Sequence, residues 1–167
     1  MKTISGFLPT STVGPRVLIL GSMPSIASLE RRQYYAHPRN VFWRIMAELF
    51  DFDVNISYEN RLKKIDAEGI ALWDVLKNCQ RPSSLDADIV ASSEAPNDFS
   101  DFLAQRSSMR KIYFNGAKAE ALFTRHVSRQ FVSQLSDIQL RRLPSTSPAH
   151  ASMGYTQKLS CWRAIVA

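Results

Sequence analysis

The sequence contains few residues that could cross-link the chain and no segment that could anchor it in a bilayer. Cys79 and Cys161 are its only cysteines, and they stand far apart with no CxxC spacing. Neither a disulfide framework nor a zinc site is therefore indicated, and a reducing compartment is favoured. No apolar run approaches the roughly 20 residues that span a bilayer, and the N-terminus has no basic segment followed by a long apolar one. We expect a cytoplasmic protein that is not embedded in a membrane.

Internal repeats and low-complexity tracts are also absent. The 167 residues are 45% hydrophobic and 22% charged, which is the composition of an ordinary soluble globular protein and argues against disorder. A chain of this length folds most simply as one domain and buries roughly 70% of the surface of its unfolded form. We therefore predict a single domain over residues 1–167.

Positive charge is in excess. The chain has 21 Lys and Arg against 15 Asp and Glu, which gives a formal net charge of +6 and a pI near 9.6. Such an excess favours a polyanionic partner, nucleic acid first and an acidic membrane surface second, although many basic proteins bind neither. Charge alone therefore leaves the partner open.

Short apolar runs alternate with helical patterns along the chain. Four runs predict strands: Val17 to Leu20, Ile70 to Trp73, Lys111 to Asn115 and Ile138 to Leu143. Helices are predicted over Val41 to Phe50, Tyr58 to Ile65, Phe99 to Leu103 after a capping Asn97, Ala117 to His126 and Gln157 to Val166. Residues 1–15 are expected to be an extended lead-in, and residues 77–96 a long irregular loop. The alternation predicts an α/β fold, a three-layer α/β/α sandwich with a mostly parallel sheet of about four strands.

The segments at the ends of the predicted strands are the candidates for a site, because ligands of open α/β sheets bind beyond the carboxyl ends of the strands. These segments are Gly21-Ser22-Met23-Pro24, Trp73-Asp74, Phe114-Asn115-Gly116 and Ser145 to His150. A further loop, Tyr34 to Asn40, lies between the first predicted strand and the first predicted helix. In a parallel sheet the strand ends meet at one edge, so we expect these segments to face one crevice.

Asn40 has two interpretations, one structural and one catalytic. In the structural one it is a helix cap, since it stands where a helix cap belongs. An amide takes no proton at neutral pH, so a catalytic Asn40 would orient a water or a sugar group and would not act as a general base. The nearby aromatic residues are each more typical of a core than of a stacking platform. Their clustering at strand ends favours stacking, because an extruded base is held between aromatic faces. They are Tyr34, Tyr35, Phe42, Trp73 and Phe114.

Each remaining polar candidate also has a functional and a structural interpretation. His37 and His150 could donate a hydrogen bond or a proton to a leaving group or phosphate, or could simply bind the backbone of their loops. Asp74 is the only carboxylate at a predicted strand end, and solvation or helix capping is its alternative explanation. Asn115 with Gly116 could present N–H groups to an anion or form a plain turn.

The loop from Ser145 to Ser147 lies between two prolines and close to Arg141 and Arg142. Its small hydroxyl groups suit the oxygens of a phosphate, and a polar turn is the alternative.

Three blocks of sequence resemble a known family: Gly21-Ser22-Met23-Pro24, Gln33 to Trp43 (QYYAHPRNVFW) and Leu143 to His150 (LPSTSPAH). Together they resemble the uracil-DNA glycosylase superfamily, and most closely its hypoxanthine-DNA (deoxyinosine) glycosylase branch. Phe114-Asn115-Gly116 also resembles the mismatch-specific thymine and uracil members. The likeness extends from Val17 to His150, and it departs from the branch at Ser25, where the branch often has glycine.

The resemblance implies a monofunctional DNA glycosylase of base excision repair. Such an enzyme hydrolyses the N-glycosidic bond of a deaminated base, hypoxanthine first, and leaves an abasic site. It implies a catalytic role for Asn40, which would position the water. The chemistry also needs a donor toward the leaving base, which would be His37, as a second catalytic residue, or backbone N–H groups near Ser22 and Met23. The implied base pocket is Gly21, Ser22, Met23, Pro24, Tyr35, Phe42, Trp73, Asp74, Phe114 and Asn115. The implied DNA contacts are Arg39, Ser145, Thr146, Ser147, Pro148 and His150.

The resemblance also implies DNA containing a deaminated base as the partner, a monomer, and no metal or other cofactor. No lysine stands out at the strand ends, so we expect neither an imine intermediate nor strand cleavage. Two alternatives stay open: a mismatch-specific uracil or thymine glycosylase, and a catalytically silent nucleic-acid-binding module on the same fold.

Overall fold

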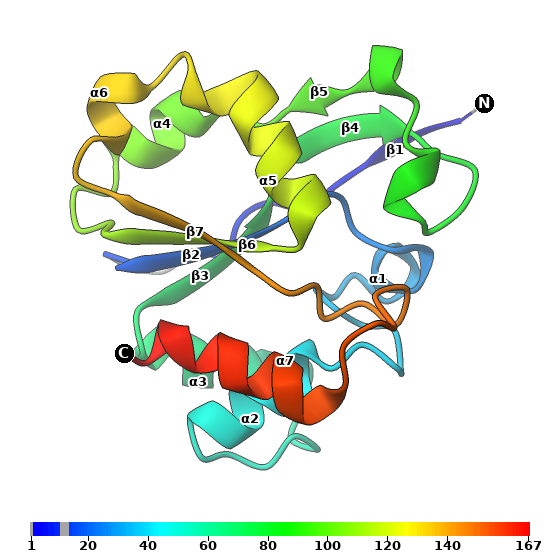
Figure 1. The fold of residues 1–167 in the computed structure, drawn as a ribbon, viewed down its shortest axis with the longest axis vertical. Coiled ribbons are helices and arrows are strands. Elements are labelled where there is room, and N and C mark those ends of the chain that lie inside the picture. Colours follow the sequence, from blue (N-terminus) through cyan, green and yellow to red (C-terminus); the bar gives the residue numbers. More distant parts are fainter. Residues whose placement is uncertain (1, 11–13) are drawn as a thin grey trace.

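A four-stranded parallel sheet forms the centre of the protein (Figure 1). The computed structural model describes residues 2–10 and 14–167. In spatial order the strands are β3 (Ile70–Asp74), β2 (Val17–Gly21), β6 (Lys111–Asn115) and β7 (Gln139–Leu143). Each lies within one residue of its predicted bounds. β7 is one of the two edge strands and is exposed at its first four residues, which is why it accommodates Arg141 and Arg142.

Both faces of the sheet are covered, as the uninterrupted apolar run in β2 predicts. Successive side chains of a strand point to opposite faces. Leu18 and Leu20 therefore join one hydrophobic core, while Val17 and Ile19 join the other. All four are buried.

Helices lie on both sides of the sheet (Figure 1). The core that contains Ile19 is completed by α2 (Phe42–Leu49), α3 (Tyr58–Ala67) and α7 (Tyr155–Trp162), which a 3-10 turn extends over Arg163–Ile165. The core that contains Leu18 is completed by α4 (Phe99–Ala104), α5 (Ala117–Phe123), a π-helical turn (Thr124–Ser128) and α6 (Val132–Leu135). The predicted three-layer α/β/α sandwich is confirmed. No helix in the described ranges is long and apolar enough to cross a membrane.

A second, smaller sheet was not predicted. It is antiparallel and consists of β1 (Thr3–Ser5), β4 (Leu76–Gln80) and β5 (Ala95–Pro96), with β4 in the middle. The irregular loop predicted at residues 77–96 is therefore wrong in part, whereas the lead-in is extended at β1 and pairs there with β4. Residues 1 and 11–13 of the lead-in lie outside the described residues. These strands are short and carry little alternation, so long-range pairing and not local sequence defines them. Two 3-10 turns, Asp86–Asp88 and Ala91–Ser93, lie between β4 and β5.

The cap predicted for α4 is one residue too early. The carboxylate of Asp98, not Asn97, accepts from the N–H groups of Ser100 and Asp101 at 3.0 and 3.3 Å. Asn97 instead donates from Nδ2 to the carbonyl oxygen of Asp74 at 2.8 Å. The amide thus fixes the backbone at the carboxyl end of β3.

Candidate active site

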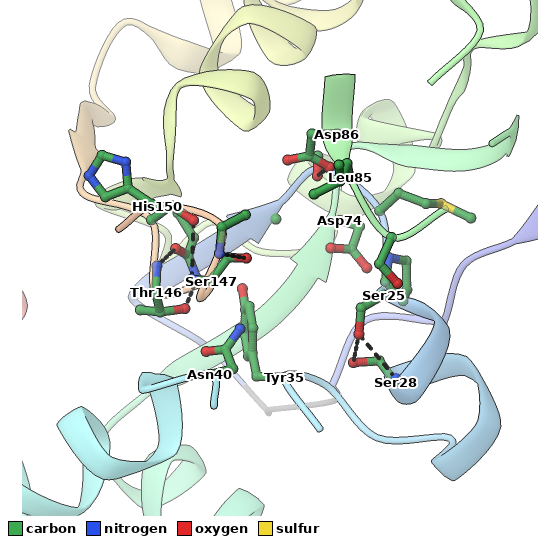
Figure 2. Close-up of a pocket in the computed structure, with 18 of the residues that line it drawn as sticks. Ser25, Ser28, Tyr35, Asn40, Asp74, Leu85, Asp86, Thr146, Ser147 and His150 are labelled. Atoms are coloured by element: carbon green, nitrogen blue, oxygen red, sulfur yellow. Dashed lines mark hydrogen bonds between the residues drawn. The ribbon is translucent and has the colours of Figure 1, made fainter. Parts of the chain in front are cut away.

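The carboxyl ends of the parallel strands open onto a cavity of about 340 Å³ (Figure 2). It lies beside β2 and β6, where the strand order reverses, which is the usual place for a ligand in an open α/β sheet. The residues of the predicted site that line it are Gly21, Ser22, Met23, Pro24, Tyr35, Asn40, Asp74, Asn115, Ser145, Thr146, Ser147 and His150. Segments more than a hundred residues apart in sequence therefore meet around one space.

Asn40 lies just before α2, with its side chain at the cavity. The cap residue of the helix is Val41, but Asn40 Oδ1 accepts from the N–H of Phe42, the first residue of the helix, at 3.0 Å. An amide oxygen has a second lone pair, and no hydrogen bond of Asn40 Nδ2 is found within the described ranges. Asn40 thus stabilises the start of the helix and still presents hydrogen-bonding groups to the cavity. The two interpretations of this residue are compatible.

The loop after β7 is fixed by Asn115. Asn115 Nδ2 donates to Thr146 Oγ1, and the N–H of Thr146 donates to Asn115 Oδ1, both at 2.9 Å. Gly116 must be a glycine here, because its φ is +99° and a Cβ atom would lie 2.9 Å from Ser145 Cβ. Both polar groups of the Asn115 amide are therefore used within the protein.

Lys158 on α7 also fixes this loop, although the sequence did not predict it as a site residue. It is buried, and its Nζ donates to the carbonyl oxygens of His150 at 2.9 Å and Ser147 at 3.3 Å. Burial lowers the pKa of this amine. The only sequence signal is that a lysine falls on the buried side of a helix, beside Leu159 and Trp162.

Asp74 ends β3 and is buried against the first loop. A Cβ atom at Gly21 would lie 2.4 Å from Asp74 Oδ1, so only glycine fits at position 21. Burial, and secondarily the nearby Asp86 carboxylate, raise the pKa of Asp74 to about 8, while the Arg81 guanidinium acts in the opposite direction. Figure 2 shows the Asp74 side chain and the Tyr35 hydroxyl directed into the same space.

Tyr35 has a left-handed backbone conformation, with φ at 57°, which residues other than glycine rarely adopt. Its ring stacks on Phe42 with centroids 4.0 Å apart, and its hydroxyl is buried without a partner in the described part of the chain. Burial and then the Asp74 carboxyl raise the pKa of this hydroxyl. Unfavourable backbone geometry of this kind is often retained at functional sites.

Three aromatic residues expected in the base pocket do not line the cavity. Phe42 is completely buried beneath Tyr35, Trp73 packs on Phe99 and Phe102, and Phe114 packs on Phe123. The reason for Trp73 is the pleat of the strand, since Asp74 faces the cavity and its neighbour must point elsewhere. Of the aromatic residues predicted for the base pocket, Tyr35 therefore lines the cavity and the other three do not.

His37 and Arg39 also lie outside the cavity, in a neighbouring groove of about 450 Å³ that shares Tyr35 and Asn40 with it. The His37 ring accepts from the N–H of Arg39 at 3.1 Å through Nδ1. Arg31, Arg44 and Arg61 line this groove as well, and none of the groove arginines forms an ion pair with any residue that the structure describes. The groove is therefore basic. Pro148 lines neither space.

One wall of the cavity, residues 84–87, was missed by the prediction of the site. Asp86 accepts from Ser22 Oγ at 2.6 Å and lies 3.9 Å from the buried guanidinium of Arg81, which also donates to the carbonyl oxygen of Pro24. The sequence signal was the long loop itself, since such loops are usually functional or mobile. Across residues 2–10 and 14–167, no group of three or more His, Cys, Asp or Glu side chains could bind a metal ion.

Comparison with known proteins agrees with this geometry. A family model described as the uracil DNA glycosylase superfamily matches residues 9–166. The chain belongs to the uracil DNA glycosylase superfamily. The likeness seen in the sequence blocks around Gly21, Asn40 and His150 is thereby confirmed at the level of the family.

Within the superfamily, the chain is similar to two archaeal proteins named hypoxanthine DNA glycosylase. It is 36% identical to the one from Methanosarcina barkeri and 38% identical to the one from Methanosarcina acetivorans, in each case over 115 residues, 68% of this chain and 72% of the relative. A solution NMR structure of a proposed uracil DNA glycosylase from Methanosarcina acetivorans superposes with a TM-score of 0.79 at 29% identity. It covers 99% of this chain and 100% of that one.

Proposed function

We propose that this protein is a monofunctional DNA glycosylase that hydrolyses the N-glycosidic bond of a deaminated base turned out of DNA, with hypoxanthine as the first candidate. The names of the two Methanosarcina relatives support the choice of base. The product is an abasic site, which places the protein at the first step of base excision repair. We further propose that it acts as a monomeric single domain in the cytoplasm.

The reaction builds positive charge on the deoxyribose and negative charge on the departing base. An active site for it needs a positioned water, a hydrogen-bond donor toward the base, and contacts to the flanking phosphates. A metal is not required for this chemistry. The cavity has side chains suited to each need.

Asn40 positions the attacking water in this proposal. Its Oδ1 is already oriented by the N–H of Phe42, and its second lone pair and Nδ2 remain for a ligand. Because the helix start determines its direction, the amide needs little reorganisation when the substrate binds.

Tyr35 stacks on the extruded base, and Gly21 to Pro24 form the floor beneath it. Tyr35 is itself supported from behind by Phe42 at 4.0 Å, which keeps the ring in place. The loop from Ser145 to His150 and the basic groove around Arg39 bind phosphates on either side of the base. His37 lies in this groove, so in our proposal it contacts DNA and not the base itself.

The observation that carries the proposal is the closeness of Asn40 to the loop after β7. The N–H of Val41 donates to the carbonyl oxygen of Thr146 at 3.1 Å, and both segments border one cavity with Asp74. A cavity of about 340 Å³ lies within the range of ordinary small-ligand sites, roughly 300–1,000 Å³.

The test is incubation of the native protein with matched duplexes that carry hypoxanthine, uracil, xanthine or a thymine mismatch, followed by alkali. Alkali breaks the strand at abasic sites, so cleavage of the hypoxanthine duplex is the expected result. Preferential cleavage of the uracil duplex would mean that the preferred substrate is uracil, the base in the name of the structural neighbour, and not hypoxanthine. No cleavage of any duplex, with binding retained, would favour a silent nucleic-acid-binding module.

A further inference from the structure

The Asp74 carboxyl group lies at the cavity without a hydrogen-bond partner among residues 2–10 and 14–167. Its residue is 3% exposed, and Oδ2 is buried with no donor or acceptor in contact among the described residues. Its other oxygen lies 2.4 Å from the point where a Cβ atom of residue 21 would be. Asn97 binds the backbone oxygen of Asp74 and not the carboxyl group. A carboxylate held in this way would be charged, dehydrated and unpaired, which is unfavourable.

The charged and titratable groups around Asp74 do not offset the cost of burying an unpaired carboxylate. Asp86, from the 3-10 turn beside the cavity, adds a second negative charge. The guanidinium of Arg81 acts in the opposite direction, but it lies 3.9 Å from Asp86 and donates to the carbonyl oxygen of Pro24, and among the described residues it forms no hydrogen bond with Asp74. The charge of Asp74 acts on Tyr34, Tyr35 and Tyr58, and burial raises the pKa of each hydroxyl, so all three are neutral. The Tyr34 hydroxyl donates to the carbonyl oxygen of Leu8, and the Tyr58 hydroxyl accepts from the N–H of Tyr34. His150 lines the same cavity from the loop after β7.

We propose that Asp74 takes part in the reaction as a neutral carboxylic acid, and that its O–H group donates a hydrogen bond to the carbonyl oxygen of the departing base. This inference rests on the proposed glycosylase function. In the reaction, the bond from C1′ to the base nitrogen breaks and its electron pair goes to the base. A bond forms between C1′ and the oxygen of water, one water proton passes to solvent, the base anion takes up a proton from solvent, and Asp74 keeps its own.

The reason for a neutral acid is the charge that develops on the base. A carboxylate at this position would repel the base as it becomes negative, whereas an O–H donor stabilises it, and most strongly in a buried site. Deamination replaces an exocyclic amino group with a carbonyl oxygen, so hypoxanthine and uracil both offer the acceptor that such a donor needs. Burial and the charge of Asp86 raise the pKa of Asp74 to about 8, so the proton is retained at neutral pH.

The first experiment measures single-turnover cleavage of the hypoxanthine duplex from about pH 6.5 to 9.5 for the native protein and Asp74→Asn. Each rate constant is divided by the same protein's value at pH 6.5. In the native protein the rate should fall above about pH 8, approaching tenfold per pH unit, as the donor is lost. Asp74→Asn should keep a flat profile, because an amide donates at every pH tested. Asp86→Asn should move the decline to lower pH, because it removes the negative charge that opposes ionisation of Asp74.

Three results would overturn the proposal: a native rate that is flat or rises through pH 8, a decline of the same shape in Asp74→Asn, or a well-folded Asp74→Asn with no activity. A duplex that the native protein does not cleave at any pH would instead overturn the proposed function.

The second experiment needs no substrate and tests the proton alone. A folded-state pKa near 8, against an ordinary value near 4 in the unfolded chain, means that the folded protein binds the extra proton between these values. The stability due to this group is complete below about pH 4 and is lost as pH rises through 8. The free energy of unfolding in urea should therefore fall more steeply between about pH 5 and 8.5 for the native protein than for Asp74→Asn. Parallel curves for the two proteins would contradict the proposal.

Discussion

The N–H of Val41 donates to the carbonyl oxygen of Thr146 at 3.1 Å, joining the start of α2 to the loop after β7. Asn40 precedes Val41, and Thr146 is bonded in turn to Asn115 at the end of β6. This chain of contacts places the candidate catalytic amide and the candidate DNA-binding loop at fixed positions on one cavity.

Replacing Asn40 separates catalysis from helix capping. Asn40→Ser keeps a side-chain oxygen for the N–H of Phe42, so its stability should stay close to native. It loses the amide, so its single-turnover rate on the hypoxanthine duplex should fall roughly 10²-fold or more, with DNA binding retained. Asn40→Ala loses both functions and should also cost about 0.5–2 kcal/mol of stability. Native activity in Asn40→Ser would mean that this residue is only a cap.

Asn115 should act through the loop and not through the base. Asn115→Ala leaves the buried N–H of Thr146 unpaired and should lower the free energy of unfolding by about 1–3 kcal/mol, measured in urea. Asn115→Asp keeps the acceptor for this N–H and should lose less. If Asn115 recognises the base directly, the alanine variant will instead have native stability and weaker substrate binding.

Lys158 should also position this loop, through the carbonyl oxygens of Ser147 and His150. Lys158→Met fills similar space but removes the donor to the carbonyl oxygens of Ser147 and His150. We expect faster proteolysis within residues 145–153 and a rate about tenfold lower or more, since small displacements of a site are costly. The variant should remain folded, because methionine avoids the cost of burying a charge, and this offsets part of the stability lost with the two hydrogen bonds. Native protease resistance of the loop would contradict this role.

DNA binding should weaken with salt because bound phosphates release counterions. Arg39 is exposed in the basic groove, so Arg39→Gln should reduce the slope of log affinity against log salt by about 1. Arg129→Gln is the matched control. Arg129 is also exposed, but it follows the far end of the helix that starts at the cavity. Equal slopes for the two variants, or an affinity that does not depend on salt, would exclude the groove as a path for DNA.

Local sequence predicted the elements that are long and apolar. The run from Val17 to Leu20 and the helix after Asn40 were placed to within one or two residues, because buried strands and amphipathic helices have strong patterns. From the four strands, the order of the layers and the crevice at their carboxyl ends followed. The family resemblance then indicated which of the loops form the candidate site.

Features that depend on distant partners could not be predicted. β1, β4 and β5 exist because they pair with one another, and no local pattern marks them. Trp73 and Asp74 are adjacent in sequence, yet only Asp74 lines the cavity, since the pleat sends neighbours in opposite directions. Lys158 and residues 84–87 reach the site through tertiary packing, so the weak signals in their local sequence did not indicate which site they join.

The most direct test of the whole account is to measure free hypoxanthine released from a duplex that carries a single hypoxanthine, together with the state of the strand before alkali. A monofunctional glycosylase with Asn40 at its centre should release one base per abasic site formed, leave the strand unbroken until alkali is added, and lose this release in Asn40→Ser. Release of no free base by the native protein, or strand breaks that form without alkali, would contradict the account.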